Sequence, residues 1–154
     1  MAGKAGLKAG LIGTAAMLVW TVIGRFLPMS GAWVWVSSGV SLLMYAGIGV
    51  LAGFFLALPR TPGKGAGAGA IAGLISGVIA GVVGVVILNI QIASGGAVPG
   101  LSPEQMQGIQ QLTESGMDPA MFALLTIPSV VCVMGIGSGL AAIGGAIFAA
   151  VKPD

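Results

Sequence analysis

Arg25 and three carboxylates are the charged side chains that stand apart from the basic segments of this sequence. Arg25 falls at the end of a long apolar run, whereas Glu104, Glu114 and Asp118 share one polar stretch. A guanidinium at the end of an apolar segment can extend to lipid headgroups or pair with a carboxylate. We therefore predict that Arg25 is an outer-face charge, which acts as a lipid-facing anchor or pairs with one of the three carboxylates.

Catalytic and metal-binding constellations are absent from the sequence. It has no histidine and one cysteine, Cys132, so the commonest metal ligand and general base is missing. No nucleophile stands beside a base, and no carboxylate pair lies in an apolar segment. The glycine-rich stretches at Gly135 (GIGSGL) and Pro62 (PGKGAGAG) lack the setting and the spacing of nucleotide-binding loops. We predict no enzymatic activity, no catalytic residue, no metal site and no cofactor.

The composition is that of a protein whose solvent is lipid. Charged residues make up 6% of the 154 residues and hydrophobic residues 56%, and the mean hydropathy is +1.07. Soluble domains carry about 25% charged residues, so this chain could not cover a surface that faces water. The net charge of +2 comes from scattered residues. We therefore expect the lipid bilayer as a partner and no nucleic acid.

Four apolar stretches are long enough to cross a bilayer as helices, which takes roughly 20 residues each. They are too long for barrel strands and lack strict alternation. We predict an all-α, polytopic membrane protein, with four transmembrane helices in a bundle that forms a single domain, residues 1–154. The predicted spans cover residues 5–27, 33–58, 65–93 and 119–151, and an outer loop covers 94–118.

The basic residues predict the orientation of these spans. Lys4 and Lys8 precede the first span, Arg60 and Lys64 lie between the second and third, and Lys152 follows the fourth. By the positive-inside rule these segments are cytoplasmic. We predict a multi-pass protein of the cell (inner) membrane with both termini in the cytoplasm. The first apolar run is longer than a signal-peptide core, so we expect it to remain as a span.

Glycine recurs at every fourth residue of the third predicted span, and a row of alanine and serine runs beside it. Residues four apart share one helix face, so the two rows form a strip that another helix can approach closely, as in a glycine zipper. The fourth predicted span carries a small-residue row that could pack against it. The predicted helix-packing interface contains Gly65, Gly69, Gly73, Gly77, Gly81, Gly84, Gly137, Ala141 and Gly145. Its partner is either another span of the same chain or another subunit.

The outer loop contains signals for a short amphipathic helix. Ser102 suits the N-cap, Pro103 the first helical position and Gln105 the capping box, and Gly116 suits the stop. This segment is a lid, a docking surface or a polar connector.

The expected function is non-catalytic. Tight-packing surfaces without reactive groups favour a structural or accessory subunit, which associates with itself as a homo-oligomer or packs on other membrane subunits. The alternative is a passive channel or small permease component, because a channel needs no titratable residue.

Overall fold

The structure is a computed structural model that describes residues 2–26, 32–93, 103–116 and 119–153. In these ranges the regular structure is entirely helical. Four helices are long and apolar enough to cross a membrane, namely α1 (Ala2–Phe26), α2 (Ala32–Phe54), α3 (Pro62–Ala93) and α5 (Pro119–Val151). The short helix α4 (Pro103–Glu114) joins α3 to α5. The predicted all-α fold is confirmed, with four helices long and apolar enough to span a membrane and a short helix between the third and the fourth.

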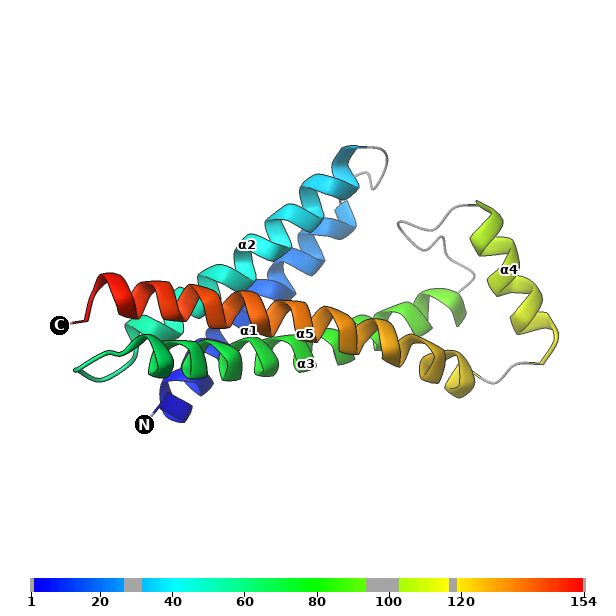
Figure 1. Cartoon of the computed structure of the whole chain (residues 1–154). Coiled ribbons are helices and arrows are strands. Elements are labelled where there is room, and N and C mark those ends of the chain that lie inside the picture. The colour runs from blue at the N-terminus through cyan, green and yellow to red at the C-terminus, as the bar shows by residue number, and fades with distance from the viewer. Residues whose placement is uncertain (1, 27–31, 94–102, 117–118, 154) are drawn as a thin grey trace.

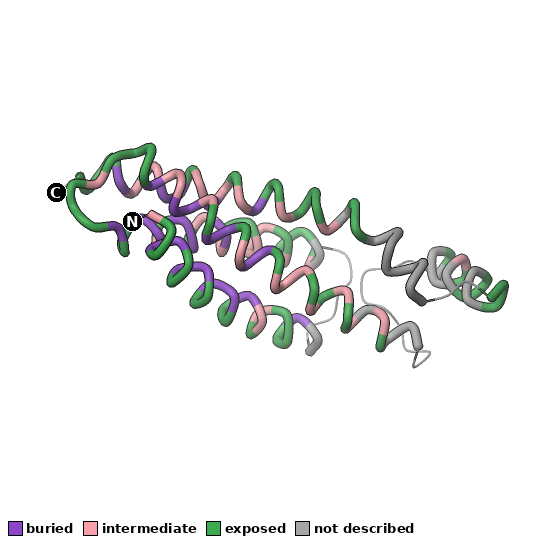
Figure 2. The backbone as a smooth tube through the Cα atoms, turned by 90° about the horizontal axis from the view of Figure 1, so that it is seen from below, coloured by how far each residue is buried: buried purple, intermediate pink, exposed green. Residues whose placement is uncertain are grey.

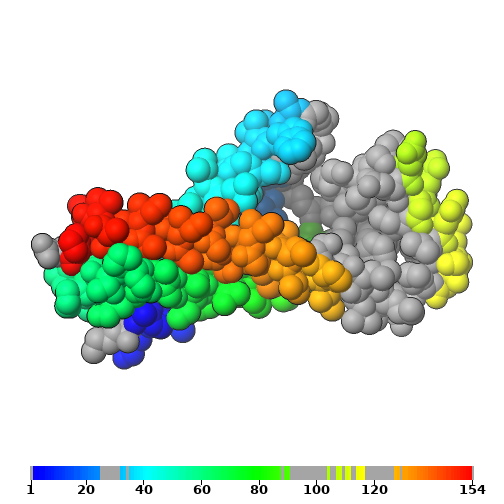
Figure 3. Space-filling model, in the orientation of Figure 1, coloured from blue at the N-terminus to red at the C-terminus, as the bar shows by residue number. Residues whose placement is uncertain are grey.

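The spans form two pairs that meet at one end of the molecule (Figure 1). Both chain termini and the α2–α3 turn lie at this end, which we call the termini end. From there α1 and α2 leave in one direction, and α3 and α5 in another, toward α4. In the space-filling view α3 and α5 stay in contact along the face shown, while α2 rises away from them (Figure 3).

The buried residues gather in the half of the bundle near the termini end (Figure 2). Most buried hydrophobic side chains there are alanines, including Ala9, Ala68 and Ala141, which are fully buried. Small side chains let helix backbones approach closely, and dispersion contacts between the backbones then stabilise the bundle. Large apolar side chains such as Leu43 and Ile90 are exposed on its outside, where a bilayer would solvate them.

The second helix ends earlier than the sequence pattern predicts. We expected the second span to extend to Leu58, but α2 ends at Phe54 and the chain turns before Arg60. Pro59 disfavours helical geometry at the residue before it. The predicted continuation of the helix through residues 55–58 was therefore wrong, because these residues are apolar and composition alone does not indicate the turn.

Local signals set the ends of the helices that follow. Thr61 caps α3: its hydroxyl accepts a hydrogen bond from the Lys64 amide (3.4 Å), and its carbonyl accepts one from the Gly65 amide (2.9 Å). After α4, Gly116 has φ +83°, a left-handed conformation that glycine adopts without strain at a helix C-terminus. The predicted stop at Gly116 is confirmed, whereas the predicted N-cap Ser102 lies outside the described residues.

Candidate functional site

The predicted glycine row of α3 lies along α5. A Cβ atom on Gly65 or Gly69 would collide with the carbonyl of Gly145 or Ala141, respectively. A Cβ on Gly73 would stand 2.7 Å from the Cα of Ser138. These positions therefore accept no side chain at the observed distance between α3 and α5. The first three glycines of the row are occupied by contacts within the chain.

The α5 backbone at Ala141 is enclosed from two sides. A Cβ on Gly49 of α2 would also collide with the Ala141 carbonyl, as one on Gly69 of α3 would. One turn later, Gly53 of α2 stands close to the Gly145 carbonyl, 3.2 Å from where its Cβ would lie. α5 therefore lies in a groove between α2 and α3 that is lined by glycines, close enough for Cα–H···O contacts between backbones.

α1 packs on the neighbouring face of α3 in the same manner. A Cβ on Gly6 would lie 2.7 Å from the Ala68 carbonyl, and one on Gly10 would lie 3.1 Å from the Ala72 carbonyl. The sequence interpretation did not include Gly6 and Gly10, although their four-residue spacing was a usable signal. The alanine row of α3 thus faces α1, and its glycine row faces α5.

Toward the α4 end of α3, the remaining predicted glycines of the strip no longer touch the α5 backbone closely. A Cβ on Gly77 would stand 3.3 Å from Met134, and one on Gly81 would stand 2.8 Å from Val130. Gly84 is exposed, and no atom lies within 4 Å of its Cβ position. The strip therefore meets backbone atoms of α5 from Gly65 to Gly73, side chains of α5 at Gly77 and Gly81, and no other described helix at Gly84.

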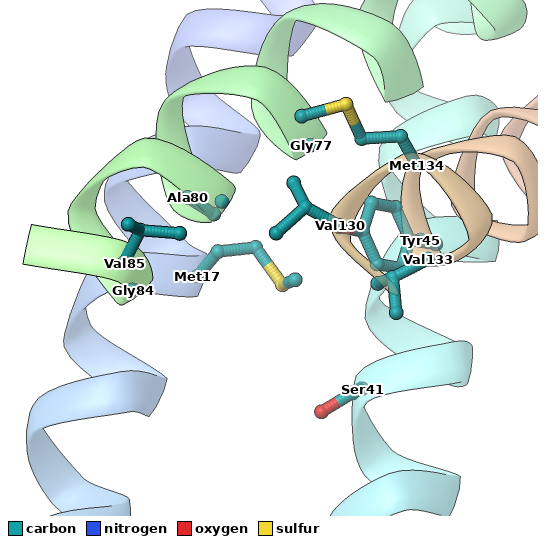
Figure 4. A pocket seen from close by; sticks show the side chains of 11 residues that line it. Met17, Ser41, Tyr45, Gly77, Ala80, Gly84, Val85, Val130, Val133 and Met134 are labelled. Atoms are coloured by element: carbon teal, nitrogen blue, oxygen red, sulfur yellow. The ribbon is translucent and has the colours of Figure 1, made fainter. Parts of the chain in front are cut away.

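The diverging helices leave a cleft of about 430 Å³ (Figure 4), which we call the interhelical cleft. All four spans contribute to it, and its side chains are almost entirely apolar. Met17 of α1 and Val130 of α5 both point into the space between the helices. The described residues that line it are Met17, Ser41, Tyr45, Gly77, Ala80, Gly81, Gly84, Val85, Val130, Val133 and Met134.

Tyr45 is the largest of the described side chains that line the interhelical cleft, and it is only 5% exposed. Its ring crosses from α2 to α5 and lies against Gly137, whose Cβ would stand 2.7 Å from Cε1 of the ring. Its hydroxyl reaches toward α3, to 3.6 Å from the Cβ position of Gly77. Gly137 thus provides space for an aromatic ring, in addition to being a position on the predicted helix interface.

The buried hydroxyl groups of the spans bond within their own helices. Thr14 donates to the Gly10 carbonyl (2.8 Å), and Ser76 donates to the Ala72 carbonyl (3.0 Å). Such bonds to the preceding turn satisfy the hydroxyl without another helix. Among the described residues, these groups therefore supply no hydrogen bond across the bundle.

Arg60 holds the termini end together, a role that the sequence interpretation missed. Its guanidinium donates to the carbonyls of Phe54 (3.3 Å) and Lys152 (3.4 Å), and it lies 5.6 Å from the ring centre of Phe148. Its backbone amide donates to the Pro153 carbonyl (3.0 Å). The side chain therefore ties the α2–α3 turn to the end of α5. No local sequence signal identifies a contact of this range.

The charges predicted for the outer side are placed only in part. Arg25 lies in the last turn of α1, and its side chain falls outside the described residues. Glu104 and Glu114 are exposed on α4, and Asp118 lies outside the described residues. The pairing of Arg25 therefore stays a prediction.

Eight of the described glycines within the spans have no neighbour within 4 Å of their Cβ positions, in contrast to the glycines at the α3–α5 contact. Two of them, Gly135 and Gly139, are exposed and lie one turn apart on α5. The eight positions are Gly3, Gly39, Gly47, Gly63, Gly67, Gly84, Gly135 and Gly139.

The chain matches no protein-family model, and no curated protein or solved structure shows significant similarity to it. Proposals about its function therefore start from the geometry described above.

Proposed function

We propose that the protein is a non-catalytic structural or accessory subunit, which associates through α5 with a second copy of itself or with a larger membrane subunit. The observation that carries this proposal is the pair Gly135 and Gly139, both exposed and both open at the Cβ position. Glycine inside a helix costs about 0.5–1 kcal/mol relative to alanine. Several span glycines of this chain, such as Gly65 and Gly145, serve close helix contacts, which supports the same use of the open pair toward another chain.

The surroundings of the pair support an interface of this kind. Ile136 and Ile143 are each 58% exposed on α5; Ile136 lies beside the two glycines, and Ile143 follows Gly139 one turn later in the same row. A groove of small residues next to branched apolar side chains suits the packing of another transmembrane helix. The glycine row from Gly65 to Gly73 is already occupied within the chain, so the proposed subunit contact uses α5 instead.

We further propose that both termini face the cytoplasm and that the protein lies in the cell (inner) membrane. Lys4, Lys8, Arg60, Lys64 and Lys152 all lie in the segments at the termini end. A basic side chain beside a span favours the cytoplasmic side. A shared end for both termini agrees with four spans.

The accessory role has more support than a passive channel formed by one chain. The hydroxyls of Thr14 and Ser76 point back to carbonyls of their own helices, and the interhelical cleft is apolar. Conduction requires polar groups along a continuous path. A channel would therefore have to form at the centre of an oligomer.

Native mass spectrometry of the protein extracted gently from its own membrane tests the proposal. We expect a homo-oligomer or a fixed complex with other membrane subunits, and we expect Gly135→Leu combined with Gly139→Leu to release a folded monomer. Val82→Leu combined with Val86→Leu is the matched control, because both valines are exposed one turn apart on α3. A monomeric wild-type protein would overturn the proposal, and so would a double glycine variant with unchanged mass.

A further inference from the structure

The Tyr45 side chain is 5% exposed and lines the interhelical cleft. Its hydroxyl is not among the fully enclosed polar atoms of the described residues, and none of the described hydrogen bonds involves it. Polar groups in an apolar setting are nearly always hydrogen-bonded, because an unpaired hydroxyl there is destabilising. This hydroxyl therefore calls for an acceptor that enters the cleft.

The depth of Tyr45 excludes the usual sources of such an acceptor. It lies at the middle of the candidate span Trp35–Phe54. The hydrocarbon core is about 30 Å thick, so the polar parts of phospholipids stand roughly 15 Å away. Cavities lined by apolar side chains also tend to stay dry. A phospholipid in its ordinary position would offer Tyr45 only methylene groups.

The rest of the interhelical cleft fits an apolar molecule. Its volume of about 430 Å³ falls within the range of small-molecule sites, about 300–1,000 Å³. Met17 and Met134 contribute flexible thioethers, which adapt to ligands of irregular shape. The Ser41 hydroxyl donates to the Ser37 carbonyl (2.9 Å). Among the described lining residues, the free side-chain donor is therefore Tyr45.

We propose that the interhelical cleft binds a neutral, membrane-soluble molecule with a ketone or quinone carbonyl, which accepts a hydrogen bond from the Tyr45 hydroxyl. The apolar body of this molecule lies between Met17, Val130 and Met134, and it enters from the lipid where the two helix pairs diverge. The site requires neither catalysis nor the proposed subunit contact on α5.

The test uses decyl-1,4-benzoquinone as the probe and decylbenzene, which lacks the carbonyls, as its matched control. Each is titrated against the full-length protein in phosphatidylcholine nanodiscs, with empty nanodiscs subtracted. We expect saturable quinone binding at one molecule per chain. Tyr45→Phe keeps the ring and removes the donor, so it should weaken quinone binding about threefold to tenfold. The same variant should leave decylbenzene binding unchanged.

Two glycine variants check that binding occurs in the interhelical cleft. Gly84 lines it with no atom within 4 Å of its Cβ position, so Gly84→Leu should fill the space and abolish binding of both probes. Gly47 is equally open but does not line the cleft, so Gly47→Leu should bind as the wild type does. The proposal is overturned if the wild type shows no saturable quinone binding, if Tyr45→Phe binds the quinone as tightly as the wild type, or if Gly84→Leu retains binding.

Discussion

Gly65 of α3 and Gly145 of α5 are reciprocal neighbours: a Cβ atom on either residue would collide with the carbonyl oxygen of the other. The two backbones are therefore in direct contact, without a side chain between them. Backbone atoms cannot move aside as the end of a flexible side chain can. Substitution at either position must push the two helices apart, which also disturbs the contacts of Ala141 with α2 and α3.

The contact between Gly65 and Gly145 predicts an unusually large effect for one methyl group. We expect Gly145→Ala to lower the free energy of unfolding by about 1–3 kcal/mol, the range of overpacking in tight cores. Gly47→Ala is the matched control, because its Cβ meets no atom within 4 Å. We expect that variant to be neutral or more stable by roughly 0.5 kcal/mol. Unfolding titrations in mixed micelles measure both, and equal effects would contradict the packing.

Tyr45 and Gly137 provide a second prediction. A Cβ on Gly137 would stand 2.7–2.9 Å from three carbons of the Tyr45 ring, so Gly137→Ala should displace the ring and destabilise the protein by about 1–3 kcal/mol. In a Tyr45→Ala background that loss should largely disappear, because the ring is gone. A double-mutant cycle measures this coupling. Additive effects of the two substitutions would mean that the ring and Gly137 do not press on one another.

Arg60 carries a prediction for the termini end. Arg60→Met keeps the apolar stem but loses the hydrogen bonds to the Phe54 and Lys152 carbonyls and the contact with the Phe148 ring. Since the side chain is half-buried, we expect a loss of about 1 kcal/mol. Hydrogen exchange should accelerate in the last turn of α5. Lys152→Met is the control, because Arg60 bonds to the backbone carbonyl of Lys152, and it should leave the exchange rate nearly unchanged.

The sequence was sufficient to predict four spans, because long apolar runs have few other stable structures in lipid. The helical period also placed Gly65, Gly69 and Gly73 on one face. It could not identify the helix that covers this face, since a periodic row fits a neighbour in the same chain or in another subunit equally well. In the structure α5 packs on the glycine face of α3, and α1 packs on the adjacent alanine row.

The interhelical cleft could not be predicted for a related reason. Tyr45 was one of several polar residues within the spans, and the sequence does not distinguish a satisfied hydroxyl from an unpaired one. That difference depends on where α1 and α2 diverge from α3 and α5. Arg60 presents the same difficulty, because its acceptor on Lys152 is 92 positions away in the chain.

The final prediction concerns the side of the membrane on which the termini end lies. Lys64→Cys and Gln110→Cys each introduce one thiol at an exposed position, on α3 and α4 respectively. Cys132 is replaced by alanine in both, because it is exposed too. With a maleimide that does not cross membranes, Gln110→Cys should react in intact cells, and Lys64→Cys only after permeabilisation, since basic segments stay in the cytoplasm. The opposite labelling pattern would mean that the termini end faces the outside of the cell, because Lys64 lies at the start of α3 and Gln110 lies beyond its end.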